Sequence, residues 1–226
     1  MPRLKKEANF SYMLIGMLIT LVIGPVLLEF GIERFGFSIL LSLNITLIVG
    51  VWSIVDSRRW FWIGVSLAAF TIIVSSIDII WPSFTAEVIG LTGIITFCFF
   101  SLVFTLTRLF QSPDRQITAN RLIGAASVYL LLGLGFGVLN MLIALVLPGS
   151  YKGLTPGGDG SVGIDLIYYT FVSMTTLGYG DVVPIRPLAQ AVAYMSAVAG
   201  QFYIAILVAG LVGAYVAQQL QGGQSK

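Results

Sequence analysis

Charged residues are scarce in this sequence, and histidine is absent. Asp, Glu, Lys and Arg make up 10% of the 226 residues, against about 25% in an average soluble domain. The net charge of +2 is too small to indicate a nucleic-acid partner. Cys98 is the only cysteine, so an intrachain disulfide is impossible and the usual zinc-ligand sets are missing. The carboxylates are not paired by spacing, which argues against a membrane enzyme, and we expect no organic cofactor.

Apolar residues dominate instead, at 57% of the chain with a mean hydropathy of +0.95. One core cannot bury this much apolar surface, so the surplus must face lipid. Continuous apolar runs predict helices, because a membrane barrel needs alternating apolar and polar residues. A spanning helix needs about 20 residues. Six runs reach this length, which predicts an all-α membrane protein, and they are Tyr12–Phe30, Phe37–Val55, Trp60–Trp81, Val88–Phe110, Leu122–Leu147 and Leu188–Val216.

The distribution of positive charge predicts the orientation of these helices. With the N-terminus in the cytoplasm, only Arg34, Lys152 and Arg186 of the twelve Lys and Arg fall outside. This asymmetry is typical of multi-pass proteins and places both termini in the cytoplasm. No small-residue cleavage site follows the first run, and the loops are short. We therefore expect a retained first helix and a location in a prokaryotic cell membrane.

The stretch between the last two runs breaks the pattern. It begins with a Gly-rich loop, Pro148–Gly163, and continues with the apolar segment Ile164–Thr175, which is too short to span and fits a re-entrant helix. The sequence TTLGYGD follows at residues 175–181. Its glycines permit backbone angles that turn successive carbonyls to one side. Non-helical backbone at membrane depth is buried in protein or lines a water-filled path, and a helix C-terminus carries partial negative charge. These features favour a cation pathway.

Residues 175–181, called the signature segment below, resemble the potassium-channel signature, Thr-x-Gly-Tyr-Gly followed by Asp. The order of outer helix, pore helix, filter and inner helix over about Leu122–Gly213 is similar to the pore module of that family. The resemblance implies a selectivity filter that binds K+ as the permeant ion through backbone carbonyls, with Gly180 at the outer mouth. The filter residues that it implies are Thr176, Leu177, Gly178, Tyr179 and Gly180.

The same resemblance implies further roles. The residues expected to support the filter are Tyr168, Tyr169, Thr175 and Asp181. Gly200 falls where many family members place a hinge glycine of the inner helix. Val172 departs from the pattern, because some relatives carry there a Glu that pairs with the Asp of the signature. That pair cannot form here, and the sequence leaves the partner of Asp181 open.

One filter strand cannot enclose an ion, and this chain carries one. We therefore expect a homotetramer, or a mixed tetramer with close relatives, around a central pore. The expected domains are a four-helix, voltage-sensor-like membrane module (1–110), a cytoplasmic linker helix (111–121) that begins at Ser112-Pro113-Asp114, a pore domain (122–219) and a short cytoplasmic tail (220–226).

The fourth apolar run lacks the charges of a voltage sensor. Moving one charge through the membrane is worth about 2.3 kcal/mol per 100 mV, but Val88–Phe110 contains only Arg108. We expect weak or no voltage dependence. Asp78 lies at or near the outer edge of the membrane, where an acid is a possible sensor of external pH.

The sequence thus favours passive, potassium-selective conduction, with K+, identical subunits and the lipid bilayer as partners. A weakly selective cation channel is an alternative, although Tyr179 between two glycines argues against it. A non-conducting regulatory subunit of a related channel is another, and the intact signature argues against that.

Overall fold

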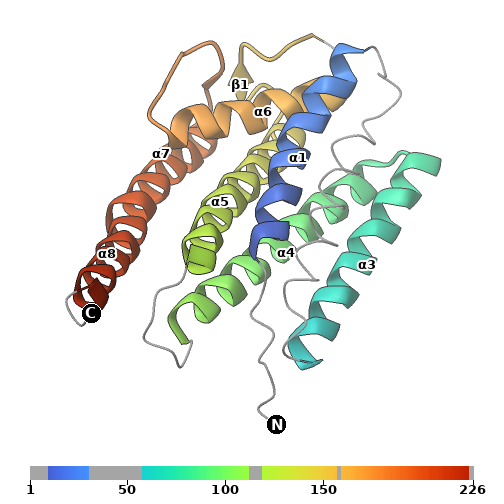
Figure 1. The fold of residues 1–226 in the computed structure, drawn as a ribbon. Coiled ribbons are helices and arrows are strands. Elements are labelled where there is room, and N and C mark those ends of the chain that lie inside the picture. The colour runs from blue at the N-terminus through green and yellow to red at the C-terminus, as the bar shows by residue number, and fades with distance from the viewer. Residues whose placement is uncertain (1–9, 31–57, 112–118, 157–158, 224–226) are drawn as a thin grey trace.

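The computed structural model describes residues 10–30, 58–111, 119–156 and 159–223. In these parts the chain is almost entirely helical (Figure 1). The helices are α1 (Phe10–Glu29), α3 (Arg58–Ile80), α4 (Phe84–Gln111), α5 (Ala119–Val146), α6 (Asp159–Met174), α7 (Pro187–Phe202) and α8 (Ala209–Gly223). A π-helix, η1 (Tyr203–Val208), joins α7 to α8. Two short strands, β1 (Tyr151–Lys152) and β2 (Val183–Pro184), form an antiparallel pair.

Five helical stretches in the described residues are long and apolar enough to cross a membrane. They are Phe10–Leu27, Trp60–Asp78, Phe84–Thr107, Ala119–Val146 and Pro187–Gln218. These stretches correspond to five of the six expected spans, and the described residues therefore form an all-α membrane protein. The other expected span, Phe37–Val55, and the expected helix start at Ser112 lie outside the described residues.

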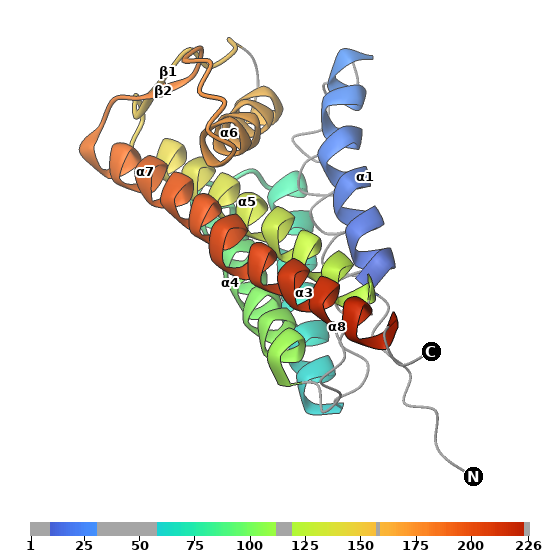
Figure 2. The same ribbon diagram turned by 60° about the vertical axis from the view of Figure 1, so that its left-hand side comes forward.

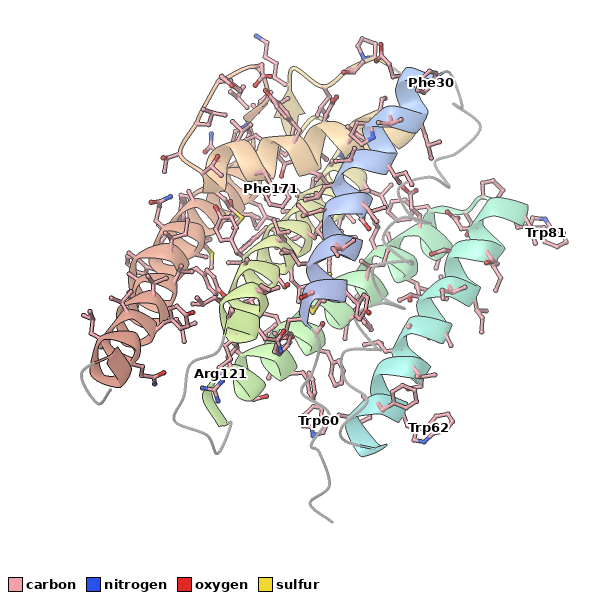
Figure 3. The ribbon with its side chains drawn as sticks, in the orientation of Figure 1. Phe30, Trp60, Trp62, Trp81, Arg121 and Phe171 are labelled. Atoms are coloured by element: carbon pink, nitrogen blue, oxygen red, sulfur yellow. The ribbon has the colours of Figure 1, made fainter. Side chains whose placement is uncertain are left out.

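Aromatic side chains mark both ends of the bundle. Trp60 and Trp62 lie near one end, as does the basic residue Arg121, and Phe30 and Trp81 lie near the other (Figure 3). Aromatic belts at the two membrane interfaces have this arrangement, because an indole ring presents an apolar body and a polar N–H to the headgroup region.

α5 is the central helix, because both the early helices and the C-terminal elements pack against it (Figures 1 and 2). One core joins α1, α4 and α5 of the same chain, and α3 packs against α4. The buried residues of that core are Phe10, Met13, Met17, Leu91, Ile94, Cys98, Leu131, Leu134 and Val138. The N-terminal helices therefore pack on the α5 of their own chain.

Two glycines of α5 seat α6. Gly133 and Gly137 are buried one turn apart. A Cβ at position 133 would overlap the Phe171 ring, and one at position 137 would lie 3.1 Å from the side chain of Ile167. Small residues at this spacing let membrane helices approach closely. α6 therefore crosses α5 with its side chains directly against the α5 backbone, and Phe171 points toward α5 (Figure 3).

The start of α6 differs from the expectation. The helix begins at Asp159, within the expected loop Pro148–Gly163, instead of at Ile164. The apolar pattern missed this first turn because residues 159–163, DGSVG, are polar and glycine-rich. The same loop contains β1, which pairs Tyr151 with Pro184 and so connects the chain before α6 to the chain after the signature segment.

Cys98 and Gly135 provide a test of this packing. A Cβ at position 135 would lie 3.5 Å from the Cβ of Cys98, within the range of roughly 3.5–4.5 Å in disulfides. We expect Gly135→Cys to form a disulfide with Cys98 inside one chain after catalysed oxidation, detected on a non-reducing gel and as a linked peptide by mass spectrometry. The control is Gly135→Cys with Cys98→Ala, which should not react. A disulfide that joins two chains would show that α4 packs on a neighbour's α5.

Candidate functional site

The end of α6 organises the signature segment. The last carbonyls of a helix have no helical partners and must find other donors. Here the backbone N–H groups that follow α6 supply them, and the Val172 carbonyl accepts two. The bonds run from Thr175 to Phe171 (2.9 Å), from Thr176 to Ser173 (3.1 Å), and from Leu177 and Gly178 to Val172 (3.0 and 3.2 Å). The chain therefore turns back over the helix end before it extends outward.

The sign of φ alternates along the backbone of the signature segment. Thr176, Gly178 and Gly180 have φ of 61°, 59° and 78°, whereas the residues between them do not have positive φ. In an ordinary strand successive residues face opposite sides. Alternation between left- and right-handed residues turns successive peptide groups to the same side instead. The segment therefore has the backbone form that can present a row of carbonyl oxygens to one ligand.

Thr176 is a strained residue in this row. Glycine adopts positive φ freely, but a β-branched residue in that region is an outlier. Such a conformation costs of order 1–3 kcal/mol and persists only where the surroundings enforce it, which is most often at functional sites. This strain, in the first turn after α6, makes residues 175–181 a candidate functional site.

The segment is open on one side. Residues 175–181 are all exposed, and the large apolar side chains of Leu177 and Tyr179 are 55% and 65% exposed. The chain by itself therefore leaves the signature segment uncovered.

Asp181 has a partner that the sequence left open. The hydroxyl of Tyr168 donates a 2.7 Å hydrogen bond to Oδ2 of Asp181, while Oδ1 accepts the N–H of Val182 at 3.0 Å. The Tyr168 bond lowers the pKa of Asp181, with a smaller contribution from the Val182 N–H. The lowered pKa of Asp181 stabilises the folded state. This contribution is complete above the ordinary pKa of an aspartate and is lost as the pH falls through the lowered pKa. Val172, in the position where some relatives carry Glu, is buried.

Tyr169 faces a different neighbour. Its ring lies edge-on to that of Tyr151, with centroids 5.7 Å apart. The hydroxyl of Tyr151 donates to Oδ1 of Asn140 at 2.8 Å, and Nδ2 of Asn140 donates to the hydroxyl of Thr170 at 2.8 Å. Asn140 and Thr170 are fully buried. This network ties α5, β1 and α6 together. The sequence reasoning missed Asn140, although an amide inside an apolar span is itself a signal that a polar partner exists.

Gly200 and Asp78 lie in ordinary packing and turn positions. A Cβ at position 200 would lie 3.1 Å from both the Cβ and the carbonyl oxygen of Met174, so glycine favours the close approach of α7 to the end of α6. Asp78, at the end of α3, accepts the N–H of Ser83 at 3.1 Å in the turn before α4. The Ser83 hydroxyl in turn caps α4 by accepting the N–H of Ala86 at 3.1 Å.

Residues 125–217 match the model of a protein family described as ion channel. The matched range runs from α5 through α6 and the signature segment to α8. No curated protein and no solved structure matches the chain. Together with the apolar helices, the match supports an ion channel and a multi-pass membrane protein.

The Asn140 network yields a stability prediction. Asn140→Leu leaves the buried hydroxyl of Tyr151 without its acceptor, and an unpaired buried polar group costs about 1–3 kcal/mol. We expect the free energy of unfolding in detergent to fall by this amount, as measured by circular dichroism. Tyr151→Phe in the same background removes the orphaned hydroxyl and should recover part of the loss. Equal stability of Asn140→Leu and the wild type would contradict the prediction.

Proposed function

We propose that this chain is one of four identical subunits that enclose a passive, potassium-selective pore. The observation that carries the proposal is the alternation of left-handed φ at Thr176, Gly178 and Gly180 at the end of α6. In the proposed filter the carbonyls of residues 176–179 replace the hydration shell of K+, and Gly180 lies at the outer mouth. The hydroxyl of Thr176 completes the innermost site.

The position of α6 supports a cation as the ligand. The helix ends at Met174, directly before the signature segment. The C-terminus of a helix carries partial negative charge equivalent to roughly half an elementary charge. A cation within reach of residues 175–178 is therefore favoured by the helix as well as by the carbonyl oxygens, without any ionised side chain. The carboxylate of Asp181 adds negative charge beside the outer end of the segment.

The surface of the chain supports assembly through its C-terminal helices. Only 12% of the Pro187–Gln218 span is buried within the chain, and Leu177 and Tyr179 are exposed as described above. A closed ring of identical chains covers such surfaces by symmetry, and one signature segment per chain calls for four chains. α5 is then the outer helix, and α7, η1 and α8 form the inner helix.

The remaining features of the proposal concern topology and regulation. The chain would cross a prokaryotic cell membrane six times, with Phe37–Val55 as its second span and both termini in the cytoplasm. Residues 1–110 would form the membrane module and residues 122–219 the pore domain. Tyr168, Tyr169, Thr175 and Asp181 would support the filter. The hinge role of Gly200 and the pH-sensing role of Asp78 stay predictions.

Gly178 provides the selectivity test. Its φ is 59° and no atom lies within 4 Å of an added Cβ, so Gly178→Ala introduces only backbone strain, at a cost of about 1–2 kcal/mol. We expect wild-type protein in planar bilayers to reverse near the K+ equilibrium potential in opposed K+ and Na+ gradients. Gly178→Ala should shift the reversal potential toward zero or abolish the current.

Gly149→Ala is the matched control. Its φ of 75° and open surroundings impose the same strain at a loop position outside the signature segment, and its reversal potential should equal that of the wild type. A wild-type reversal potential near zero would favour the weakly selective cation channel. Absence of K+ flux from the purified wild type would favour the non-conducting regulatory subunit.

The charge content of α4 provides a gating test. Glu87 and Arg108 are the charged residues of this helix, and they lie near its two ends. One gating charge that crosses the field would change the open-to-closed ratio about fifty-fold per 100 mV. We expect a much smaller change in steady-state open probability between −100 and +100 mV in symmetrical K+. Steep voltage dependence that disappears in Arg108→Gln would contradict this expectation.

A further inference from the structure

One carbonyl at the end of α6 accepts a hydrogen bond from a side chain of another helix. The carbonyls of Phe171, Val172 and Ser173 accept N–H groups of the signature segment. The carbonyl of Met174 instead accepts a 3.0 Å hydrogen bond from Nε2 of Gln201, which lies 27 residues later on α7. The inner helix therefore takes part in the hydrogen bonding that forms the base of the signature segment.

The residue before Gln201 explains how the side chain reaches. Gly200 is buried, and a Cβ there would crowd the Cβ and the carbonyl oxygen of Met174 at 3.1 Å each. α7 thus comes close to α6 at position 200, and the next residue donates to the carbonyl at that contact. A polar amide on an apolar membrane helix is stabilised by such a partner.

Gln201 also lies at a change in helix type. α7 ends at Phe202, and η1 begins at the next residue. π-helical turns within α-helices occur frequently at functional sites. Tyr203, the first residue of η1, is tied to the outer helix because its hydroxyl donates to the carbonyl of Ala125 at 2.6 Å. The inner helix is therefore attached to its own chain at Gln201, near the end of α7, and at Tyr203, where the π-helical turn begins.

We propose that Gln201 is a positioning residue that couples the inner helix to the base of the filter. This inference rests on the proposed function. Met174 lies two residues before Thr176, whose positive φ persists only while neighbouring bonds enforce it. Gln201 supplies one of those bonds. When it is lost, the backbone at Thr175 and Thr176 relaxes, and the innermost ion site changes with it.

The first experiment removes the amide. Gln201→Met keeps the length of the side chain but cannot donate to the Met174 carbonyl. In single-channel recordings we expect bursts of openings that are about three- to tenfold shorter, which is the change expected for the loss of one hydrogen bond. Gln190→Met is the matched control on the same helix, because the Gln190 amide contacts the carbonyls of Pro184 and Ile185 at 3.4 and 3.3 Å, away from α6. Its bursts should match those of the wild type.

The second experiment makes the bond titratable. In Gln201→Glu, a protonated carboxyl can donate to the Met174 carbonyl and an ionised one cannot. We expect burst duration close to the wild type at low pH and close to Gln201→Met at high pH, whereas Gln190→Glu should show no such change. A purely structural role of residue 201 would give no pH-dependent recovery, and the absence of recovery would overturn the inference.

A third measurement separates this inference from the proposed function. Hydrogen exchange of peptides that cover residues 175–180, in purified protein, should be faster in Gln201→Met than in the wild type and unchanged in Gln190→Met. If the wild type fails to conduct K+ but the exchange difference is present, the proposed function fails and the Gln201 link stands. If the wild type conducts but neither exchange nor burst duration responds to Gln201→Met, the link is refuted.

Discussion

The carbonyl groups at the end of α6 impose the constraint on which the rest of the structure depends. They need donors, and the helix itself cannot supply them. The Val172 carbonyl takes two N–H groups from the chain that follows, so that chain must fold back, and Thr176 adopts a positive φ that threonine ordinarily avoids. Alternation at Gly178 and Gly180 then continues the same backbone form. The proposed function follows from this local requirement more than from any single side chain.

Contacts with the surrounding elements fix the position of α6 and of the signature segment that follows it. Gly133 and Gly137 remove side chains from the surface of α5 on which α6 lies. Asn140 fixes α6 and β1 through one buried amide. Tyr168 holds Asp181 at the far end of the signature segment, and Gln201 holds its near end. Bonds within the same chain thus restrain the signature segment near both ends, while residues 175–181 themselves stay exposed.

The sequence predicted the features that depend on composition, such as the apolar spans. It did not predict features that depend on local contacts, such as the partner of Asp181. Five of the expected spans appear because continuous apolar runs have few alternatives in a membrane. The first turn of α6 was missed because DGSVG is polar and glycine-rich. The partner of Asp181 could not be read because Tyr168 is thirteen residues away and could equally have been an interfacial aromatic. The π-helix was missed because YIAILV, residues 203–208, is apolar like the helices around it.

The central claim is that four chains place residues 176–180 around one axis and bind dehydrated monovalent cations there. The most direct measurement is a structure of the full assembly grown with Rb+ or Tl+, in which anomalous scattering locates the ions. The account predicts four chains around a row of ion peaks, lined by the carbonyls of residues 176–179. Another number of chains, a signature segment turned away from the axis, or ions found elsewhere would contradict it.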